Sequence, residues 1–443
     1  MKFRFFSTAL LVIALCSAAF SQTLDTAKLD KFLNTLAEKN KAMGSLAIAK
    51  DGKILYTRAI GYSHINGTEK MAATTATKYR IGSITKMFTA VMVMQLVEEG
   101  KLKLTDTLDK FYPQIPNASK ITIEQMLGHR SGIHSFTSDE DFATWLMNPK
   151  TPAEMIEIIA KGKPDFEPEA KAAYSNANFI LLGQIVETLD KKSYQDALKS
   201  RITSKIGLKD TYLGGKTDVK NNETFSFNYA DGWKVANETH LSIPGGAGAL
   251  VSTPTDLTKF ITALFDGKLV SQASLDQMKT FKHRYGFGMM PFPLGDKTVI
   301  GHGGGIDGFN AMLFYLPEEK LAVAYTSNGK GYSPNSVILG AMDIYWGKPF
   351  NIPTFETVTV SAEVLEKYVG VYASAAHPLK ITITREVTTL KAQATGQPVF
   401  SLEATATDKF KFDQAGLVLE FDAANNQMTL RQGGRVTVFT KEK

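Results

Sequence analysis

The sequence predicts an α+β protein in which an antiparallel sheet is flanked by helices and carries a helical insertion, followed by a small all-β barrel. Its 443 residues are enough for two or three domains. Strand-like runs stand near residue 50 and near residue 320, and helical patterns fill much of the region between them. Beyond about residue 360 only short alternating runs remain.

Composition and charge exclude several classes of protein. A hydrophobic content of 44% is ordinary for a globular protein and excludes a disordered, a collagen-like or a polytopic membrane chain. The net charge of +6 is spread without a basic run, so we expect no nucleic-acid partner. The single cysteine, Cys16, permits neither an intramolecular disulfide nor a cysteine-based zinc site, and the seven histidines form no metal-binding motif. We therefore expect no metal and no cofactor.

Residues 1–21 are typical of a secretory signal peptide. A basic start precedes an apolar stretch from Phe5 to Ala18, and small residues follow where a signal peptidase cleaves. The stretch is too short to span a bilayer, so we expect no stable membrane span. We expect an exported protein, periplasmic or extracellular. The alternative is a lipoprotein anchored at Cys16, which the bulky Leu15 before it disfavours.

Local signals justify the elements of residues 22–350 in order. In a hairpin from Gly44 to Gly61, Asp51-Gly52 is a turn signal between two strand-like runs. Apolar residues at helical spacing predict a helix over Lys86 to Glu99. Later elements are expected at Ile123 to Leu127, Pro152 to Ala160 and Asn178 to Leu189 (helices), from Thr253-Pro254 (a capped helix), at Ala311 to Leu316 and Leu321 to Ser327 (strands), and near Ser336 to Trp346 (a helix).

The pattern changes after residue 350. Prolines and a threonine-rich stretch predict a linker at 351–360. In residues 361–443, eight strand-like runs separated by turns predict a small up-and-down barrel. The runs are Tyr368 to Ala373, Leu379 to Arg385, Thr388 to Ala394, Pro398 to Ala404, Lys409 to Asp413, Leu417 to Asp422, Gln427 to Gln432 and Arg435 to Thr440.

Ser83-Ile-Thr-Lys86 is the first candidate for chemistry. A serine in the first turn of a helix meets unpaired N–H groups and the positive end of the helix dipole. A lysine three residues later lies on the same face, loses its proton more easily there and can accept the proton of the serine. The same spacing also arises by chance. A second copy, Ser327 to Lys330, falls at a strand end where this geometry is wrong.

Tyr174-Ser-Asn176 is the second candidate. Near a cationic lysine, a tyrosine can lose its proton below its usual pKa and act as general base and acid. The amide of Asn176 could bind a substrate carbonyl. The alternative is a half-buried loop tyrosine before the next helix.

The third candidate is Gly301-His302-Gly303-Gly304-Gly305, which follows a short strand, Thr298 to Ile300. Glycines there would let a substrate lie against the strand edge and would expose N–H groups for an oxyanion hole. A hairpin connection with positive φ angles is one alternative. The oxyanion loop of lipases is another, although the sequence lacks their G-x-S-x-G. Among the histidines, His302 alone is expected in a site, whereas His129 and His134 are expected to be structural.

In this order the three motifs resemble the serine β-lactamase and penicillin-binding-protein superfamily. The tyrosine motif is similar to that of class C β-lactamases and of their D-Ala-D-Ala carboxypeptidase, D-aminopeptidase and esterase relatives. Three further sequence segments resemble the same branch: Ile121–Ile133, Gly245–Pro254 and Tyr285–Gly288. The resemblance covers about residues 30 to 345. The terminal strands resemble the lipocalin-like barrel that often follows such hydrolases.

The resemblance implies an acyl-serine mechanism. Ser83 would be the acylated nucleophile and Lys86 its proton acceptor. Tyr174 would deliver protons to the leaving group and activate water for deacylation. The substrate-binding residues would be Asn176, His302, Gly303 and Gly304, and the N–H groups of Ser83 and Gly305 would form the oxyanion hole.

The third motif differs from that of a β-lactamase, because His302 and Gly303 stand where the family usually has lysine and threonine. A neutral imidazole beside a glycine holds the carboxylate of an antibiotic less well. The sequence therefore predicts a serine hydrolase that cleaves a small amide or ester, such as a D-amino-acid peptide or a short acyl ester. The partner is expected to be a small molecule or short peptide.

Other functions remain open at this stage. The chain could be a true β-lactamase, a D-Ala-D-Ala carboxypeptidase, or a sensor that penicillin acylates without turnover. The barrel could instead be the functional part and bind an apolar ligand.

Overall fold

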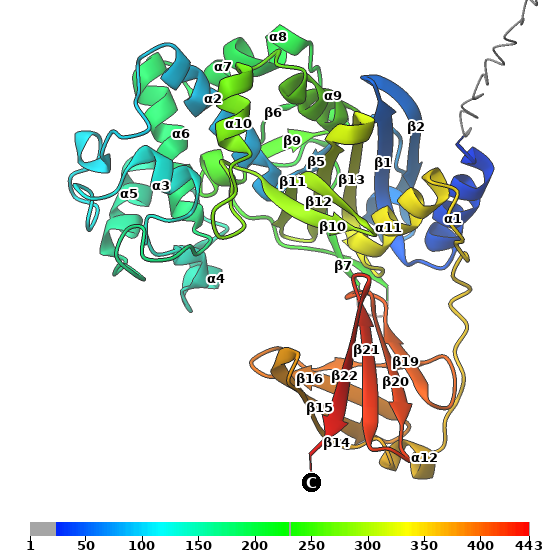
Figure 1. Ribbon diagram of the computed structural model, residues 1–443. Helices are drawn as coiled ribbons and strands as arrows, with labels where there is room; N and C mark the ends of the chain where they lie inside the picture. The colour runs from blue at the N-terminus through cyan, green and yellow to red at the C-terminus, as the bar shows by residue number, and fades with distance from the viewer. Residues whose placement is uncertain (1–23, 230–231, 443) are drawn as a thin grey trace, which may run out of the picture.

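The computed structural model describes residues 24–229 and 232–442. The predicted signal peptide, with Cys16, lies outside the described residues. Figure 1 shows an antiparallel sheet with helices on both of its faces, and a separate barrel formed by the C-terminal strands. The predicted α+β fold with a terminal barrel is therefore confirmed.

The central sheet pairs strands from near residue 50 with strands from near residue 320. Its main path is β10-β11-β12-β13-β1-β2, and Ala47 in β1 lies opposite Thr57 in β2 and Ala324 in β13. The predicted hairpin is therefore formed by β1 and β2. The strands are β1 (Ala42–Lys50), β2 (Lys53–Ile60), β10 (Met290–Leu294), β11 (Lys297–Ile306), β12 (Phe309–Leu316) and β13 (Leu321–Lys330), with β7 (Phe227–Tyr229) and β8 (Trp233–Val235) attached to β13.

Both faces of this sheet are buried, because alternate residues of each strand enter different apolar clusters. In β12, Leu313 packs in the cluster that contains α2 and α6, whereas Phe314 packs with α1 and α11. A strand buried on both faces appears in sequence as a continuous apolar run, as in residues 311–316. Figure 1 shows α1 (Thr26–Glu38) and α11 (Pro334–Tyr345) together beside the sheet, away from the helical region.

The helical region lies between β2 and β10 in sequence. Three of its helices start as the sequence predicts: α3 and α5 have capping boxes at Thr122 and Thr151, and Thr253 accepts from Asp256 N at the start of α9. The helices are α2 (Thr85–Glu98), α3 (Ile123–Leu127), α4 (Phe142–Trp145), α5 (Pro152–Lys161), α6 (Asn176–Asp190), α7 (Tyr194–Leu198), α8 (Ser204–Ile206), α9 (Pro254–Phe265) and α10 (Gln272–Met278). Short strands accompany them: β3 (Tyr62–Asn66), β4 (Glu69–Ala72), β5 (Tyr79–Arg80), β6 (Tyr212–Leu213) and β9 (Leu250–Ser252).

The C-terminal strands form an antiparallel sheet in the order β17-β16-β15-β14-β22-β21-β20-β19-β18. Its two end strands, β17 and β18, are separated in sequence by Leu402 alone, so the barrel is nearly closed. The sequence predicts one strand from Pro398 to Ala404, and this is wrong, because the chain pairs first with β16 and then with β19. The strands are β14 (Gly370–Ser374), β15 (His377–Glu386), β16 (Thr389–Ala394), β17 (Phe400–Ser401), β18 (Glu403–Ala404), β19 (Lys409–Phe412), β20 (Leu417–Asp422), β21 (Gln427–Gln432) and β22 (Arg435–Lys441).

A short helix, α12 (Ala362–Glu366), precedes the barrel and is not predicted by the sequence. Residues 348–361 form neither helix nor strand. The barrel contacts the rest of the molecule through Asp413, whose carboxylate pairs with Lys41 at 2.6 Å and whose carbonyl accepts from Ser333 N at 2.7 Å. The domain bounds of 22–350, 351–360 and 361–443 stay a prediction.

Candidate active site

Ser83 lies in a single 3-10 turn, Gly82–Ile84, that leads directly into α2. Gly82 has a φ of +49°, a left-handed conformation that favours glycine. The turn touches β11: an added Cβ at Gly82 would lie 2.8 Å from Gly305 N, and one at Gly304 would overlap the Ile81 carbonyl oxygen. Glycines at 82 and 304 therefore allow the serine turn to approach the strand.

Lys86 is fully buried one turn after the serine. Its Nζ lies 3.1 Å from Ser83 Oγ, 2.8 Å from Asn176 Oδ1 and 2.8 Å from the Ala247 carbonyl oxygen. Burial lowers the pKa of Lys86 well below its ordinary value. Among the described residues, no carboxylate forms an ion pair with Lys86 to offset this effect. The neutral amine can therefore accept the Ser83 proton, and its two hydrogens suffice for the amide and carbonyl oxygens.

Tyr174 lies in the loop before α6 with its ring 4.8 Å from Lys86 Nζ. Burial raises its pKa above the ordinary value of a tyrosine, although a hydrogen bond with the Ser83 side chain acts in the opposite direction. The sequence predicts a lowered pKa beside a cationic lysine, and this is wrong because burial dominates and the Lys86 amine is itself neutral. The phenol therefore holds its proton at neutral pH and is a proton donor in the resting site.

Asn176 is the first residue of α6, and both ends of its amide have partners. Its Oδ1 accepts from Lys86, and its Nδ2 donates to Thr137 Oγ1 at 3.1 Å. Asn176 thus helps to hold the lysine in place. Its predicted contact with a substrate amide stays a prediction.

His302 lies in β11, buried, with its ring centroid 6.1 Å from that of Tyr174. Burial lowers its pKa to about 3, so the ring is neutral. Its Nδ1 bonds to the Gly303 carbonyl oxygen, which can only accept. The proton is therefore on Nδ1, and Nε2 is left as an acceptor.

The glycines around His302 belong to β11 and pair with β12, with Gly303 opposite Met312 and Gly305 opposite Asn310. The alternative of a hairpin connection is wrong, since the turn lies beyond them at Asp307, whose φ is +54°. Gly303 and Gly304 are thus backbone of the strand edge beside the serine turn. The predicted oxyanion hole at the N–H groups of Ser83 and Gly305 is consistent with this proximity and stays a prediction.

His129, which the sequence predicts to be structural, packs against a residue of the candidate site, and the sequence does not predict that contact. Its ring stacks on Tyr174 with centroids 4.4 Å apart, and its Nδ1 accepts from Ser175 N at 3.1 Å. Burial lowers the pKa of His129 well below its ordinary value, so a neutral ring fixes the tyrosine. In the sequence, its position within the segment Ile121–Ile133, which resembles the family, is the signal that His129 lies near the site.

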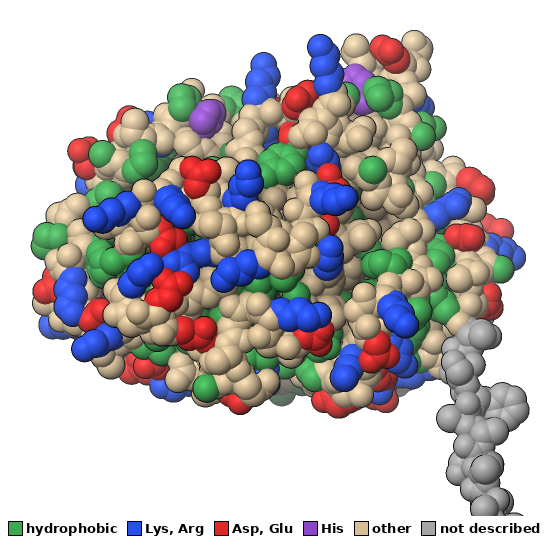
Figure 2. All heavy atoms as spheres, turned by 90° about the horizontal axis from the view of Figure 1, so that it is seen from above, with side chains coloured by type: hydrophobic (Ala, Val, Ile, Leu, Met, Phe, Trp, Pro, Cys, Tyr) green, Lys and Arg blue, Asp and Glu red, His purple; other side chains and the backbone are tan. Residues whose placement is uncertain are grey.

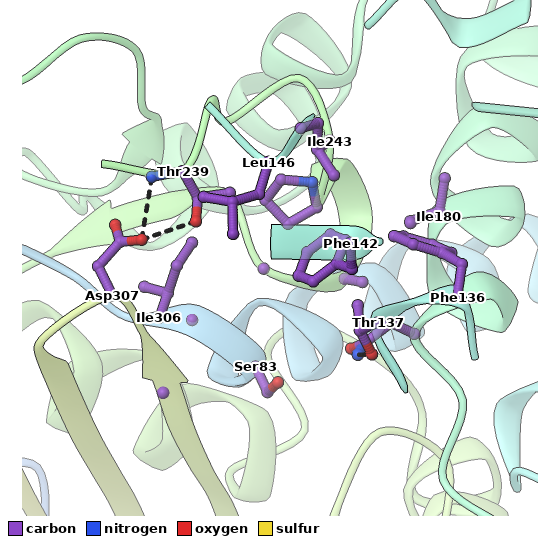
Figure 3. A pocket seen from close by; sticks show the side chains of 16 residues that line it. Ser83, Phe136, Thr137, Phe142, Leu146, Ile180, Thr239, Ile243, Ile306 and Asp307 are labelled. Carbon is purple, nitrogen blue, oxygen red and sulfur yellow. Dashed lines mark hydrogen bonds between the residues drawn. The ribbon is translucent and has the colours of Figure 1, made fainter. Parts of the chain in front are cut away.

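A pocket of about 350 Å³ opens beside Ser83. Figure 3 shows Phe136, Phe142 and Ile243 clustered above Ser83, with Asp307 on the opposite wall from Phe136. The sequence does not identify the apolar residues of this wall, because an apolar residue that lines a pocket follows the same pattern as one in the core.

The described residues contain no group of three or more His, Cys, Asp or Glu that could hold a metal ion. Of the helices in residues 24–229 and 232–442, none has the length and apolar character that crossing a bilayer requires.

Comparison with known proteins gives consistent matches. A family model described as Beta-lactamase matches residues 29–340. Penicillin-binding protein 4* of Bacillus subtilis (strain 168) is 24% identical over 457 residues, which cover 91% of this chain and 96% of the relative. A teichoic acid D-alanine hydrolase of Staphylococcus aureus (strain NCTC 8325 / PS 47) is 26% identical over 313 residues, 69% of this chain and 74% of the relative. The structure of D-amino acid amidase from Ochrobactrum anthropi SV3 complexed with L-phenylalanine amide matches with a TM-score of 0.63 and 26% identity, over 72% of this chain and 99% of that one.

Proposed function

Because this chain belongs to the β-lactamase family and is a serine hydrolase, we propose that it cleaves small amides or esters of D-amino acids, or short acyl esters, through an acyl-Ser83 intermediate. The observation that carries the proposal is the 3.1 Å contact between Lys86 Nζ and Ser83 Oγ, made by a buried lysine whose pKa is lowered. A neutral amine in contact with a serine hydroxyl is a general base at its nucleophile.

In the acylation step, Lys86 takes the Ser83 proton while the serine oxygen bonds to the acyl carbon. The negative charge moves to the former carbonyl oxygen, which the N–H groups of Ser83 and Gly305 stabilise. When the bond to the leaving group breaks, Tyr174 donates its proton to the leaving nitrogen or oxygen and recovers one from Lys86. The net change is transfer of the serine proton to the leaving group.

In the deacylation step, water attacks the acyl carbon and its proton passes through Tyr174 to Lys86. The ester bond to Ser83 then breaks, the acid departs, and Lys86 returns the proton to the serine oxygen. Because the pKa of Tyr174 is raised, the phenol holds its proton at rest, and the phenolate that forms transiently when the proton is donated is a strong base that can take the proton of water.

The substrate class rests on two supports. His302 is neutral and Gly303 has no hydroxyl, so this strand offers little to the carboxylate of a β-lactam. The relatives include a D-amino acid amidase and a teichoic acid D-alanine hydrolase, both named for D-amino acid substrates. We therefore place D-aminoacyl amides and esters ahead of β-lactams.

Intact-mass spectrometry after mixing with acyl donors tests the mechanism. Ser83→Ala should abolish the acyl adduct. Ser327→Ala, in the second S-x-x-K, should keep it, because that hydroxyl bonds to the Met43 and Gly329 carbonyl oxygens within the sheet. The reverse result would overturn the assignment of the nucleophile.

Turnover of a short ester, a D-alanyl amide, a D-Ala-D-Ala peptide and nitrocefin, measured side by side, tests the substrate class. Nitrocefin as the fastest substrate would make the chain a β-lactamase, and preference for D-Ala-D-Ala would make it a carboxypeptidase. A stable penicillin adduct without turnover of any substrate would make it a sensor.

Export is also proposed, on the basis of the residue pattern of 1–21. N-terminal sequencing of the protein recovered outside the cytoplasm should begin after Ser21. A mature protein that retains residues 1–21 in the cytoplasm would contradict it, and a lipid on Cys16 would favour the lipoprotein alternative.

The nearly closed barrel is proposed to be lipocalin-like. This proposal rests on its antiparallel strand order and on its apolar interior.

A further inference from the structure

The wall of the pocket beside Ser83 is apolar and comes from three separate segments. Phe136, Phe142 and Leu146 belong to the region before α5, where Phe142 begins α4, Ile180 belongs to α6, and Ile243 to the segment before β9. Figure 3 shows the labelled side chains of these residues converging on one end of the cavity, above Ser83. Such a wall gains free energy from binding an apolar group and offers no hydrogen bonds from its side chains.

The position of the pocket relative to the proton donor indicates which half of a substrate it receives. Ser83, Asn176 and Gly305 line the cavity, whereas Tyr174 and His302 do not. Since Tyr174 is proposed to protonate the leaving group, the leaving group lies on the side of Tyr174 and His302. The pocket therefore lies on the acyl side of the scissile bond.

The one charged side chain that lines the pocket already has partners. Among the lining residues, all within the described part of the chain, Asp307 is the one ionisable side chain. Its Oδ1 accepts from Thr239 N at 2.9 Å and from Thr239 Oγ1 at 2.6 Å, and its Oδ2 accepts from Arg80 Nη1 at 3.1 Å. Arg80 also pairs with Glu238 at 2.9 Å. The Asp307 side chain is 3% exposed and already paired, and none of the residues that line the pocket is a cation that could receive a carboxylate.

We propose that this pocket binds the side chain of the acyl group and, within the amides and esters proposed above, prefers bulky apolar side chains, such as arylalkyl or branched alkyl chains, to a methyl group or an anionic chain. The proposal rests on the acyl-Ser83 mechanism proposed above. An anionic acyl group would lose its hydration there without gaining a counter-charge. A methyl group would leave most of the cavity of about 350 Å³ unfilled.

A series of 4-nitrophenyl esters tests the selection, because acetate, phenylacetate and hemisuccinate share one leaving group. Each kcat/KM is divided by the rate constant of that ester for hydrolysis by hydroxide, which removes differences in intrinsic reactivity. Phenylacetate should exceed acetate by about tenfold or more, the scale on which hydrophobic pockets discriminate. Hemisuccinate should fall below acetate.

A pair of neighbouring variants tests the place of the pocket. Leu146 is half-buried in the wall, and Met147, the next residue, is 52% exposed and does not line the cavity. Leu146→Lys should lower the ratio of phenylacetate to hemisuccinate turnover about fivefold, as expected for one partly exposed charge pair. Met147→Lys adds the same charge outside the wall and should leave that ratio within twofold of the original.

The outcomes separate the two proposals. If Ser83→Ala hydrolyses the esters as fast as the original chain, the proposed function fails and the pocket proposal fails with it. If Ser83 is acylated but acetate or hemisuccinate is preferred, or if Leu146→Lys and Met147→Lys change the ratio equally, the pocket proposal alone is overturned.

Discussion

Arg80 and Asp307 form a buried ion pair, with Arg80 Nη1 3.1 Å from Asp307 Oδ2, that joins the two segments carrying the predicted oxyanion hole. Arg80 lies three residues before Ser83, and Asp307 lies two residues after Gly305. The pair therefore connects the serine turn to the end of β11 independently of the substrate. A buried charge pair of this kind contributes more to fixing one geometry than to net stability.

Asp307→Asn should lower kcat for ester hydrolysis about tenfold and change KM little. This loss is smaller than the one caused by removing an oxyanion donor outright, because the donors remain but are held less firmly. Asparagine tolerates the left-handed φ at this position, so the turn itself is kept. Arg80 keeps Glu238 as a partner in this variant, so the change should cost about 1.5–3 kcal/mol of stability, the value of a lost hydrogen bond to a charged group, which thermal unfolding measures.

Asp190→Asn is the matched control for that loss of stability. Asp190 is buried beside Arg201, in a second ion pair made by residues outside the pocket. The control should lose stability but keep kcat. If both variants lose stability and neither changes kcat, the Arg80–Asp307 pair has no positioning role.

Gly304→Ala should lower the acylation rate by about 10²–10³, the cost of a lost oxyanion donor. The added methyl group would overlap the Ile81 carbonyl oxygen and force β11 away from the serine turn. Gly303→Ala should cost much less, because the nearest atom to its Cβ, the Ala311 carbonyl oxygen, would be 3.9 Å away. Stopped-flow measurement of the acylation burst compares the two, and equal losses would contradict the close approach at Gly304.

Lys86 should make the stability of the protein depend on pH. Its pKa is lowered in the folded chain by burial, so between the folded and the ordinary value of 10.5 the unfolded chain binds the additional proton. The unfolding free energy therefore increases as the pH rises through this window, by up to about 1.4 kcal/mol per pH unit. Lys86→Met removes both the slope and the acylation. Urea unfolding from pH 6 to 9 measures the unfolding free energy of the original chain and of Lys86→Met. The free energy of the original chain should rise relative to that of the variant as the pH increases. A difference between the two that does not change with pH would contradict this prediction.

His134 should stabilise the folded protein at low pH only. Hydrogen bonds to Asp165 and Asp139, at 2.7 Å and 2.8 Å, raise the pKa of His134. A group with a raised folded pKa contributes its full stability below its unfolded pKa and loses it as the pH rises through the folded value. His134→Asn should therefore lower Tm below pH 6 and much less above pH 8.

The two partners of His134 provide the control for that experiment. In a variant with Asp139→Asn and Asp165→Asn, the further change His134→Asn should no longer produce a Tm difference that depends on pH. A difference that persists without the two carboxylates would contradict the ion-pair origin of the effect.

Much of the fold follows from local patterns. The capped helix at Thr253-Pro254, the Asp51-Gly52 hairpin and the run from Ile123 to Leu127 form as predicted, because caps and turn residues act within a few positions. The division of Pro398–Ala404 between β17 and β18 could not be predicted, since it depends on barrel closure with strands on both sides.

The site shows the same limit. Three motifs identify Ser83, Lys86, Tyr174 and His302 as candidates, and the structure brings all four together. The direction of the Tyr174 pKa and the stacking of His129 depend on burial, which the sequence does not contain.

The sequence by itself determined the family and the candidate nucleophile, because residue order and spacing along the chain are enough to specify a motif. The tertiary structure alone decided that Lys86 has no carboxylate partner among the described residues, that Asp307 is paired with Arg80, and that the acyl side of the site is apolar. Those properties arise from desolvation and from contacts between segments distant in sequence, such as Arg80 and Asp307, and they exist only once the chain has folded.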